Sequence, residues 1–303
     1  MIFLSKQRLP ILFILFLFLT VTVKAQDNSF TAISYNIWNG YDFGKDEIRR
    51  TKVNQWIKSQ KPDLVALQEL VKYSPEKLAE DAKSWGHEHS VLLKKDGYSV
   101  GLTSNQPIEL VSKIRDNMHH GALHCRTNGI DVLVIHFSPF SHNKRREEAD
   151  IILNTISEID KTNDQFIVLG DFNALSPMDD HLYRDQVLLN RMRENDKNKK
   201  NDGNLLDGEF EYATISAFMS YPMIDVVGRF TNDLNDRGSF PGWVLGDGSA
   251  TSNQKLKARL QRIDFIFAST EMAKNCTEAK VMNNEETHFL SDHYPVKAVF
   301  KLP

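Results

Sequence analysis

The chain has 303 residues, of which 41% are hydrophobic and 25% are charged, and its formal net charge is −3. These values indicate a globular protein with one large core or at most two domains. The mildly negative charge argues against tight, non-specific binding of polyanions over the whole surface, although it leaves room for a local basic site.

Residues 1–25 carry the pattern of a secretory signal peptide. An apolar run over 11–23 follows two basic residues, and Ala25 offers a small residue at the cleavage point. A membrane-spanning helix needs roughly 20 apolar residues, so a membrane anchor is the weaker alternative. We therefore expect a secreted or periplasmic protein with no stable membrane anchor after cleavage. Cleavage would remove three basic residues and no acid, which changes the formal charge from −3 to −6 for the mature part, 26–303.

The mature part is expected to form one domain that acts as a monomer, because it contains neither an internal repeat nor a linker that would divide it. Its two cysteines, Cys125 and Cys276, could pair in an exported protein. A domain of this size does not need a disulfide for stability, so we favour two free thiols.

Short strands and helices alternate along the chain. Period-2 alternation or short apolar runs predict strands at 30–37, 64–67, 98–103, 131–135, 166–169, 223–227, 262–267 and 296–300. Helical spacing of apolar residues predicts helices at 48–61, 75–85, 143–160 and 183–192. Asn128-Gly129 is a strong hairpin signal. This order favours an α/β fold with two packed, mainly antiparallel sheets flanked by helices.

Two long segments lack these patterns. Residues 193–209 are polar and of mixed charge, which predicts a mobile surface insertion. Its lysines could touch a polyanion, but a solvated loop is favoured. Residues 231–256 are rich in Gly, Asn, Asp and Ser, and are expected to form a long loop beside the functional site of the protein. Trp243 in that loop is either a stacking platform for substrate or a buried residue.

Polar side chains lie where several predicted strands end. Asp171 and Asn173 follow the apolar run 166–169 two residues apart, so in extended geometry they face the same side. Glu69 follows 64–67 directly and is a poor turn former. Loops at strand ends are frequent sites of catalysis and binding.

Three further strand ends complete the set. Asn36 and His136 close their strands, and Asp264 interrupts an apolar strand and should be partly buried. A buried carboxylate needs a cationic or hydrogen-bonding partner. The best candidate lies in the segment 290–296, which contains Asp292 and His293.

The residue types in this set point to a particular chemistry. Carboxylates and amides without paired cysteines suit Mg²⁺, Mn²⁺ or Ca²⁺ better than Zn²⁺. Histidines beside carboxylates suit general acid–base catalysis near neutral pH. Sites of this kind that activate water are typical of phosphate ester hydrolysis. The chain has no Gly-rich phosphate loop and no Gly-x-Ser-x-Gly nucleophile motif.

The chain resembles the endonuclease/exonuclease/phosphatase superfamily, whose fold is a deoxyribonuclease-like four-layer α/β sandwich. The resemblance rests on six segments that occur in the family's order, 34–37, 67–69, 134–137, 170–174, 262–266 and 291–295. They span essentially the whole mature chain, so together they are far more specific than any one of them.

The resemblance implies roles for the metal site and the attacking water. Glu69 would be the principal metal ligand, with Asn36 beside it and Asp292 near the metal. The metal would be Mg²⁺, or else Mn²⁺ or Ca²⁺. Asp171 would orient or deprotonate the attacking water, and Asn173 would hold a phosphate oxygen.

It also implies roles for the histidines. His293 would contact the scissile phosphate and be oriented by Asp264. His136 would neutralise the phosphate or protonate the leaving oxygen. At His120, many relatives carry Arg, so this residue is expected to bind substrate with an altered phosphate contact. Many nucleases carry an acid at the position of Trp38, and its absence argues against an abasic-site repair enzyme.

These expectations describe a secreted, metal-dependent phosphoesterase that hydrolyses phosphodiester bonds by attack of activated water, most simply a nuclease. Its partner would be a phosphate-ester substrate and possibly nucleic acid. The alternatives are a sphingomyelinase-type phospholipase C or a phosphomonoesterase on a small or lipid phosphate. A catalytically dead binding scaffold is disfavoured because the acids and histidines are all present.

Overall fold

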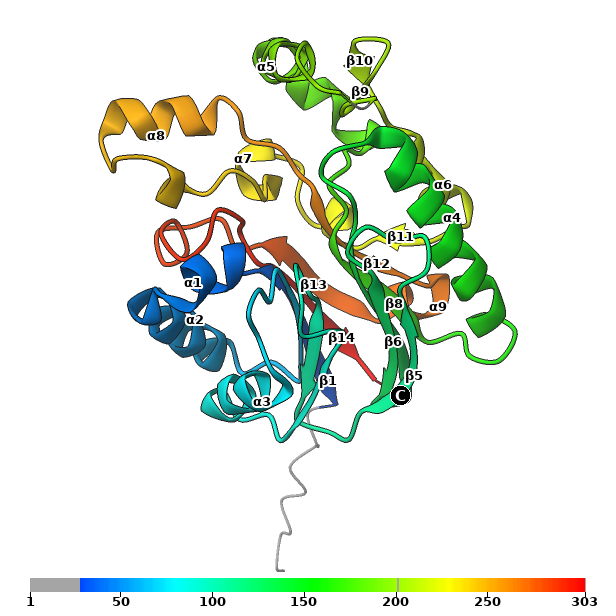
Figure 1. Cartoon of the computed structure of the whole chain (residues 1–303). Helices are drawn as coiled ribbons and strands as arrows, with labels where there is room; N and C mark the ends of the chain where they lie inside the picture. Colours follow the sequence, from blue (N-terminus) through cyan, green and yellow to red (C-terminus); the bar gives the residue numbers. More distant parts are fainter. Residues whose placement is uncertain (1–27, 201, 303) are drawn as a thin grey trace, which may run out of the picture.

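The computed structural model describes residues 28–200 and 202–302, so the expected signal peptide, 1–25, lies outside the described part. Two six-stranded sheets pack face to face, and helices cover the outer face of each sheet (Figure 1). This arrangement confirms the expected α/β sandwich with four layers.

The first sheet has the strand order β13-β14-β1-β2-β4-β3. Its strands are β1 (Ser29–Asn36), β2 (Leu64–Gln68), β3 (His89–Leu92), β4 (Gly101–Ser104), β13 (Cys276–Val281) and β14 (Val296–Lys301). β1 and β2 run parallel, and the other neighbours are antiparallel.

The second sheet has the order β11-β12-β8-β7-β6-β5. Its strands are β5 (Glu109–Ile114), β6 (Ala122–Thr127), β7 (Ile130–His136), β8 (Phe166–Asp171), β11 (Ile224–Asp225) and β12 (Asp264–Ala268). Asn128 and Gly129 form the predicted hairpin turn, since Thr127 pairs with Ile130 across it. β7 and β8 are the parallel pair of this sheet, so both sheets are mixed but mainly antiparallel.

The main helices begin at polar residues that cap them. α2 (Glu47–Gln60), α3 (Pro75–Ser84) and α4 (His142–Ile159) follow Asp46, Ser74 and Ser141, whose side chains accept a backbone N–H of the first turn. α2 and α3 cover the first sheet, and α4 and α6 (Ala213–Ser220) cover the second (Figure 1). Of the apolar residues whose spacing predicts α2, Val53, Trp56 and Ile57 are buried, whereas Ile48 is 73% exposed at the start of the helix.

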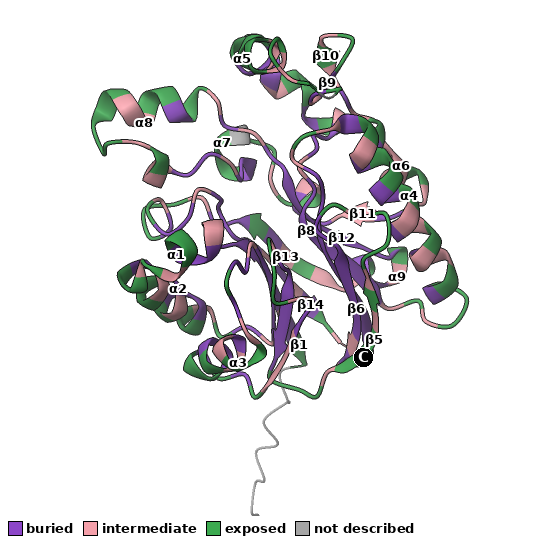
Figure 2. Cartoon of the chain, viewed as in Figure 1, coloured by how far each residue is buried: buried purple, intermediate pink, exposed green. Residues whose placement is uncertain are grey.

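The core consists mainly of three apolar layers, and Figure 2 shows buried residues on both sheets and on helices that cover them. The central layer lies between the sheets and includes Leu102, Val134, Leu169 and Ile266, all with no exposed surface. A second layer joins the first sheet to α2 and α3, and a third joins the second sheet to α4 and α6. Each fully buried side chain of this kind stabilises the fold by roughly 1.5–3 kcal/mol, and the two sheets are thereby fixed relative to each other.

The predicted polar insertion is more ordered than expected. α5 (Val187–Asp196) extends into it, and β9 (Leu205–Leu206) pairs with β10 (Glu209–Phe210). The Asp196 carboxylate accepts the backbone N–H groups of Asn204 and Leu205, at 2.8 and 3.0 Å. The polar residues that suggest a solvated loop therefore serve as local hydrogen-bonding partners.

The predicted loop 231–256 also contains helical turns. These are α7 (Leu234–Arg237), a 3₁₀ turn η3 (Trp243–Leu245) and α8 (Ala250–Lys257). Ser249 caps α8, which shows why a Ser- and Gly-rich stretch is compatible with a helix. The remaining short elements are α1 (Trp38–Gly44), α9 (Thr270–Lys274), η1 (Pro177–Tyr183) and η2 (Val227–Arg229).

Both cysteines are free thiols, as favoured from the sequence. Cys125 is buried and Cys276 is half-buried. Among the described helices, none has the length and apolar character to cross a membrane.

Candidate active site

The catalytic candidates converge because four strands bring their ends to one rim of the sandwich. Asn36 ends β1 and Glu69 follows the parallel strand β2, so both leave the first sheet at the same edge. In the second sheet, Asp171 ends β8 and pairs directly with Asp264, the first residue of the antiparallel strand β12. This rim lies at the end of the sandwich that carries α1 (Figure 1).

Asn36 links the two sheets at this rim. Its Nδ2 donates to Glu69 Oε1 at 3.3 Å and to Asp171 Oδ2 at 3.1 Å. Its Oδ1 accepts the backbone N–H of Trp38 at 3.0 Å, and Glu69 Oε2 accepts that of Asn39 at 2.6 Å. One amide therefore fixes the relative positions of two carboxylates that belong to different sheets.

The backbone around Asn36 and Glu69 is unusual. Residues 38–44, which form α1, all have positive φ, and Glu69 has a φ of 61°. Such conformations cost about 1–3 kcal/mol each outside glycine and tend to cluster at functional sites. Gly40 lies so close to the next loop that a Cβ atom there would be 2.3 Å from the carbonyl oxygen of Val71. The turn is thereby held against the loop that carries Glu69.

Arg49 of α2 holds the turn after β1 against the segment before Asp292, and the sequence pattern did not indicate this role. The guanidinium is buried and donates to the carbonyl oxygens of Ile37 at 2.7 Å, Trp38 at 3.0 Å and Leu290 at 3.3 Å. It therefore joins the end of β1 to the segment that carries Asp292.

His293 sits between two buried carboxylates. Its Nδ1 bonds Asp264 Oδ2 at 2.8 Å, and its Nε2 lies 3.8 Å from Asp171 Oδ2. This confirms the expectation that Asp264 finds its partner in the segment 290–296. Burial alone would lower the pKa of His293, but the charges of Asp264 and Asp171 outweigh burial and hold that pKa well above its usual range. Burial and the charge of Asp264 raise the pKa of Asp171.

The pKa of His136 is shifted in the opposite direction from that of His293. Its Nε2 lies 3.5 Å from Asp171 Oδ2, and its ring stacks on His120 with centroids 4.1 Å apart. Burial, together with the neighbouring histidines, keeps the pKa of His136 well below the usual value, and burial lowers that of His120 to about 3. Among the described residues, His136 Nδ1 has no hydrogen-bond partner. Two histidines with pKa values shifted apart are the arrangement that acid–base chemistry requires.

Asn173 is held beside Asp171 in the second sheet. Its backbone N–H donates to Asp171 Oδ1 at 2.9 Å, and its Nδ2 donates to the carbonyl oxygen of Phe137 at 3.1 Å. An amide nitrogen carries two hydrogens, so the second one is free for a ligand oxygen.

Two groups of side chains at the rim have donors that fit a divalent cation. Glu69 and Asp292 form the first group with Asn36, and burial raises the pKa of Asp292 to about 6, with the Glu69 charge also contributing. Ser291 Oγ connects this group, since it donates to the Asn36 carbonyl oxygen at 2.7 Å. A bound cation would reduce the repulsion between the two carboxylates, and carboxylate oxygens prefer a hard cation such as Mg²⁺ or Ca²⁺.

The second group consists of Asp171, Asp264 and His293, whose ligand atoms lie within 4.8 Å of one another. Here the Nδ1 of His293 and one oxygen of Asp264 are already bonded to each other. A cation could use the remaining oxygens, but would compete with this hydrogen bond.

Trp243 lies beside this cluster rather than in it. Its ring stacks on His288, with centroids 3.7 Å apart, and remains partly exposed. The loop itself is adjacent to the site as expected, because the Gly242 N–H donates to the Asp292 carbonyl oxygen and the Phe240 ring packs 4.9 Å from that of His293.

Comparisons with known proteins identify the family of the chain. The model of the Endonuclease/Exonuclease/phosphatase family matches residues 33–293. The enzymes of this family hydrolyse phosphoester bonds and typically depend on a divalent metal. Among curated proteins, no relative matches the chain.

Solved structures share the fold at low sequence identity. An AP endonuclease from Archaeoglobus fulgidus is 20% identical with a TM-score of 0.63. A 3′ phosphatase, NExo, from Neisseria bound to a product DNA hairpin is 18% identical with a TM-score of 0.62, and the 3′-5′ exonuclease NExo from Neisseria meningitidis is 18% identical with a TM-score of 0.61. Each comparison covers 90% of this chain and 100% of the other. On the family match, which spans most of its length, the chain belongs to the endonuclease/exonuclease/phosphatase family.

Proposed function

We propose that this protein is an exported, metal-dependent phosphodiesterase that attacks a phosphodiester with activated water, most simply a nuclease. The observation that carries the proposal is the buried group of Asp264, His293 and Asp171, joined to Glu69 through the amide of Asn36. It brings a cationic imidazole, a carboxylate of raised pKa and a candidate metal ligand to one point.

Each side chain then has a task that its surroundings support. Asp171 accepts the proton of the attacking water, because a carboxylate with a raised pKa is a better base than an ordinary one. His293 carries a positive charge, held by Asp264, and stabilises the negative charge of the phosphate. Asn173 donates its second amide hydrogen to a phosphate oxygen.

His136 acts as a neutral hydrogen-bond donor toward the leaving oxygen. Its lowered pKa argues against a role as a resident cation, which refines the first of the two roles expected from the family. His120 supports it by stacking on its ring.

Glu69, Asn36 and Asp292 would hold the divalent cation, most simply Mg²⁺, with Mn²⁺ or Ca²⁺ as alternatives. When bound, such an ion supplies positive charge for the phosphate oxygens. In the present rotamer the Asn36 oxygen accepts the Trp38 N–H, so Asn36 orients Glu69 as much as it offers a ligand atom.

The substrate is proposed to be nucleic acid because the structural neighbours include an endonuclease and an exonuclease. A membrane-acting lipase should present a hydrophobic loop, and Phe240-Pro241-Gly242-Trp243 is the candidate segment in this chain. In that segment Phe240 packs on His293, Pro241 and Gly242 are buried, and Trp243 is stacked on His288. The hydrophobic side chains of this segment therefore pack on the protein more than they contact solvent. This favours the nuclease over the lipid enzyme.

The test is hydrolysis by the mature protein, residues 26–303, with Mg²⁺ or with EDTA. Plasmid DNA, RNA, sphingomyelin and bis-p-nitrophenyl phosphate are offered in parallel, and Glu69→Ala serves as the inactive control. Cleavage of nucleic acid that is lost with EDTA and with Glu69→Ala supports the proposal. Turnover of only the lipid or the small ester keeps the mechanism and refutes the nuclease, and no turnover by a folded protein refutes the enzyme.

A further inference from the structure

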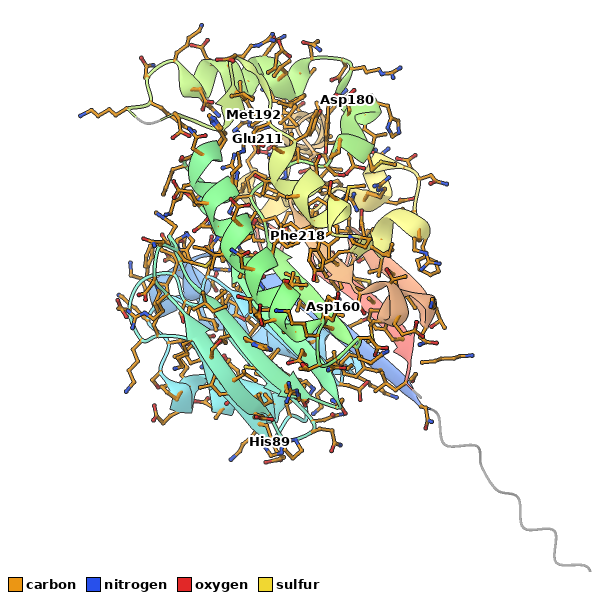
Figure 3. The ribbon with its side chains drawn as sticks, turned by 90° about the vertical axis from the view of Figure 1, so that its right-hand side faces the viewer. His89, Asp160, Asp180, Met192, Glu211 and Phe218 are labelled. Atoms are coloured by element: carbon orange, nitrogen blue, oxygen red, sulfur yellow. The ribbon has the colours of Figure 1, made fainter. Side chains whose placement is uncertain are left out.

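A pocket of about 310 Å³ opens beside the candidate active site and is not used by the chemistry described above. His293 and Asn173 line it, so it is continuous with the catalytic cluster. Its other walls come from α4, from α5 with the β9–β10 hairpin, and from the end of α8. Figure 3 shows two of its lining residues, Met192 and Glu211, close together at the end of the molecule opposite His89.

Three arginines from three different elements line this pocket. Arg145 belongs to α4, Arg191 to α5, and Arg259 follows α8. Arg145 is buried and its Nη1 donates to the Ser138 carbonyl oxygen at 3.0 Å and to Asn204 Oδ1 at 2.9 Å. It thereby ties α4 to the hairpin segment while facing the pocket.

The positive charge of these arginines is compensated only in part, because Glu211 and Glu148 act on Arg145 without forming an ion pair with it. Within the described residues, no carboxylate oxygen lies within 4.0 Å of a nitrogen of Arg145, Arg191 or Arg259. The Nε atoms of Arg145 and Arg259 are buried and lack a hydrogen-bond partner in the same part of the chain. Buried donors without a partner are costly, so the pocket is well suited to an anion.

The one acid in the lining, Glu211, offsets only part of this charge. Glu211 directs its two carboxylate oxygens to Thr214, accepting from the backbone N–H at 3.1 Å and from Oγ1 at 2.9 Å. Three guanidinium groups against one carboxylate leave the lining positive, although the mature chain carries a formal charge of −6. Arginine forks match the geometry of phosphate oxygens.

The apolar part of the lining indicates what accompanies the anion. Leu188, Met192 and Phe240 contribute hydrophobic surface to the same pocket. The volume is near the lower end of small-ligand sites, which suits one sugar or nucleoside unit with its phosphate.

We propose that this pocket binds a second phosphate group of the substrate, carried on the unit attached to the scissile phosphate. The inference rests on the proposed phosphodiesterase function and adds a substrate requirement to it, namely a second anionic group next to the bond that is cleaved. A substrate with a single phosphate would occupy the catalytic cluster and leave the arginines without a ligand.

The test is calorimetric binding in Mg²⁺ with the Glu69→Gln protein, so that no turnover is needed. The probes are thymidine 3′,5′-bisphosphate, the two thymidine monophosphates and inorganic phosphate. The bisphosphate should bind at least roughly tenfold more tightly than either monophosphate, since a charge-assisted hydrogen bond contributes about that factor or more. Arg259→Gln and Arg191→Gln, whose side chains are not fully buried, should each remove most of this advantage.

Arg146→Gln is the matched control, because Arg146 is the exposed neighbour of Arg145 on α4 and lies outside the pocket lining. It removes the same charge and should leave the affinity for the bisphosphate within twofold. Equal affinity for bisphosphate and monophosphates would overturn the proposal, as would equal effects of Arg259→Gln and Arg146→Gln. Inorganic phosphate that binds as tightly as the bisphosphate and depends on Arg259 would reveal a free-anion site, which also overturns it.

Failure of the pocket proposal and failure of the catalytic proposal can be told apart. Arginine-dependent bisphosphate binding by a protein that cleaves no phosphodiester would support the pocket and refute the phosphodiesterase. If the protein cleaves nucleic acid but its Arg259→Gln variant binds the bisphosphate unchanged, the phosphodiesterase is supported and the pocket proposal is refuted.

Discussion

Asp264 keeps His293 protonated and fixes its orientation. A second buried His–Asp pair in the same protein, away from the candidate site, shows which of these features are specific to the site. His124 and Asp131 form an equally short buried contact, 2.7 Å, at the opposite end of strands β6 and β7. There the carboxylate also accepts from Arg126 and Asn163. A buried His–Asp pair can therefore be purely structural. The catalytic role of His293 follows from its position next to Asp171.

Asp264→Asn should lower kcat/KM by roughly 10²–10⁴-fold, because the loss of the Asp264 charge removes what keeps His293 cationic and correctly turned. The acidic shift of the pH profile that accompanies this loss distinguishes a positioning role from simple damage. Asp131→Asn is the control, and it should reduce the free energy of unfolding while leaving kcat/KM unchanged. Similar activity losses in both variants, measured with bis-p-nitrophenyl phosphate, would contradict this assignment.

At this scale the sequence was informative about some residues and silent about others. Asp264 could be predicted to need a partner because it interrupts an apolar strand, and the structure supplies His293. Arg49 and the pocket arginine Arg259 carry no such signal, since arginines on helices or in polar segments are usually solvated. Their roles depend on which loops meet in space.

At the scale of elements, α2 acts on the site through Arg49. The three carbonyl oxygens that Arg49 binds belong to the end of β1, the turn α1 and the loop before Asp292. Arg50, its neighbour on the same helix, instead pairs with Asp81 at 2.7 Å, on the outer side of the first sheet. Of these adjacent arginines, Arg49 therefore supports the candidate site and Arg50 supports the packing of α2 on α3.

Arg49→Lys should destabilise the protein by about 1–3 kcal/mol, because one ammonium cannot reproduce a planar fork of donors. It should also raise the Mg²⁺ concentration needed for half-maximal activity, since the segments that carry Asn36 and Asp292 lose an anchor. Urea unfolding and a Mg²⁺ titration of activity measure the two effects. Arg50→Lys should affect only the stability, and a shifted Mg²⁺ titration in that variant would argue against the role of Arg49.

The strands could be predicted and the insertion could not, for a physical reason. A buried strand such as β8 needs apolar residues on both faces, so its sequence is distinctive. The hairpin of β9 and β10 has only two residues in each strand, and it is held by polar contacts such as those of Asp196. Polar residues that hydrogen-bond each other have the same composition as polar residues that bind water.

At the scale of the whole molecule, the site depends on the contact between the two sheets. Glu69 and Asn36 come from one sheet, and Asp171 and His136 end β8 and β7, the two central strands of the other, so the distance between them is set by the central core layer. The sandwich could be predicted from the order of short strands and from the six family segments. The mixed direction of each sheet could not, because strand pairing is absent from local patterns.

Buried neutral histidines should make the molecule sensitive to acid. The pKa of His120 in the folded protein is about 3 and that of His87 is also lowered by burial, whereas an unfolded histidine has a pKa of about 6.5. The unfolded chain then binds more protons, so stability is present above pH 6.5 and is lost as the pH falls below it. For His120 the loss is on the order of 2 kcal/mol at pH 5.

Urea unfolding of the wild type and of His120→Gln at pH 7.5 and pH 5 measures this contribution. The variant should lose less stability between the two pH values than the wild type does. An equal loss in both proteins would show that His120 is protonated in the folded state, contrary to its surroundings.

We infer that Asp171, held between His293, His136 and Asn36, is the base for attack on a phosphodiester. The most direct test of this inference is single-turnover cleavage of a DNA oligonucleotide with Mg²⁺ by the wild type and by Asp171→Asn, which has nearly the same shape. We expect a rate lower by roughly 10²–10⁴-fold in the variant, with binding of the oligonucleotide retained. A folded Asp171→Asn protein that cleaves within threefold of the wild-type rate would contradict it.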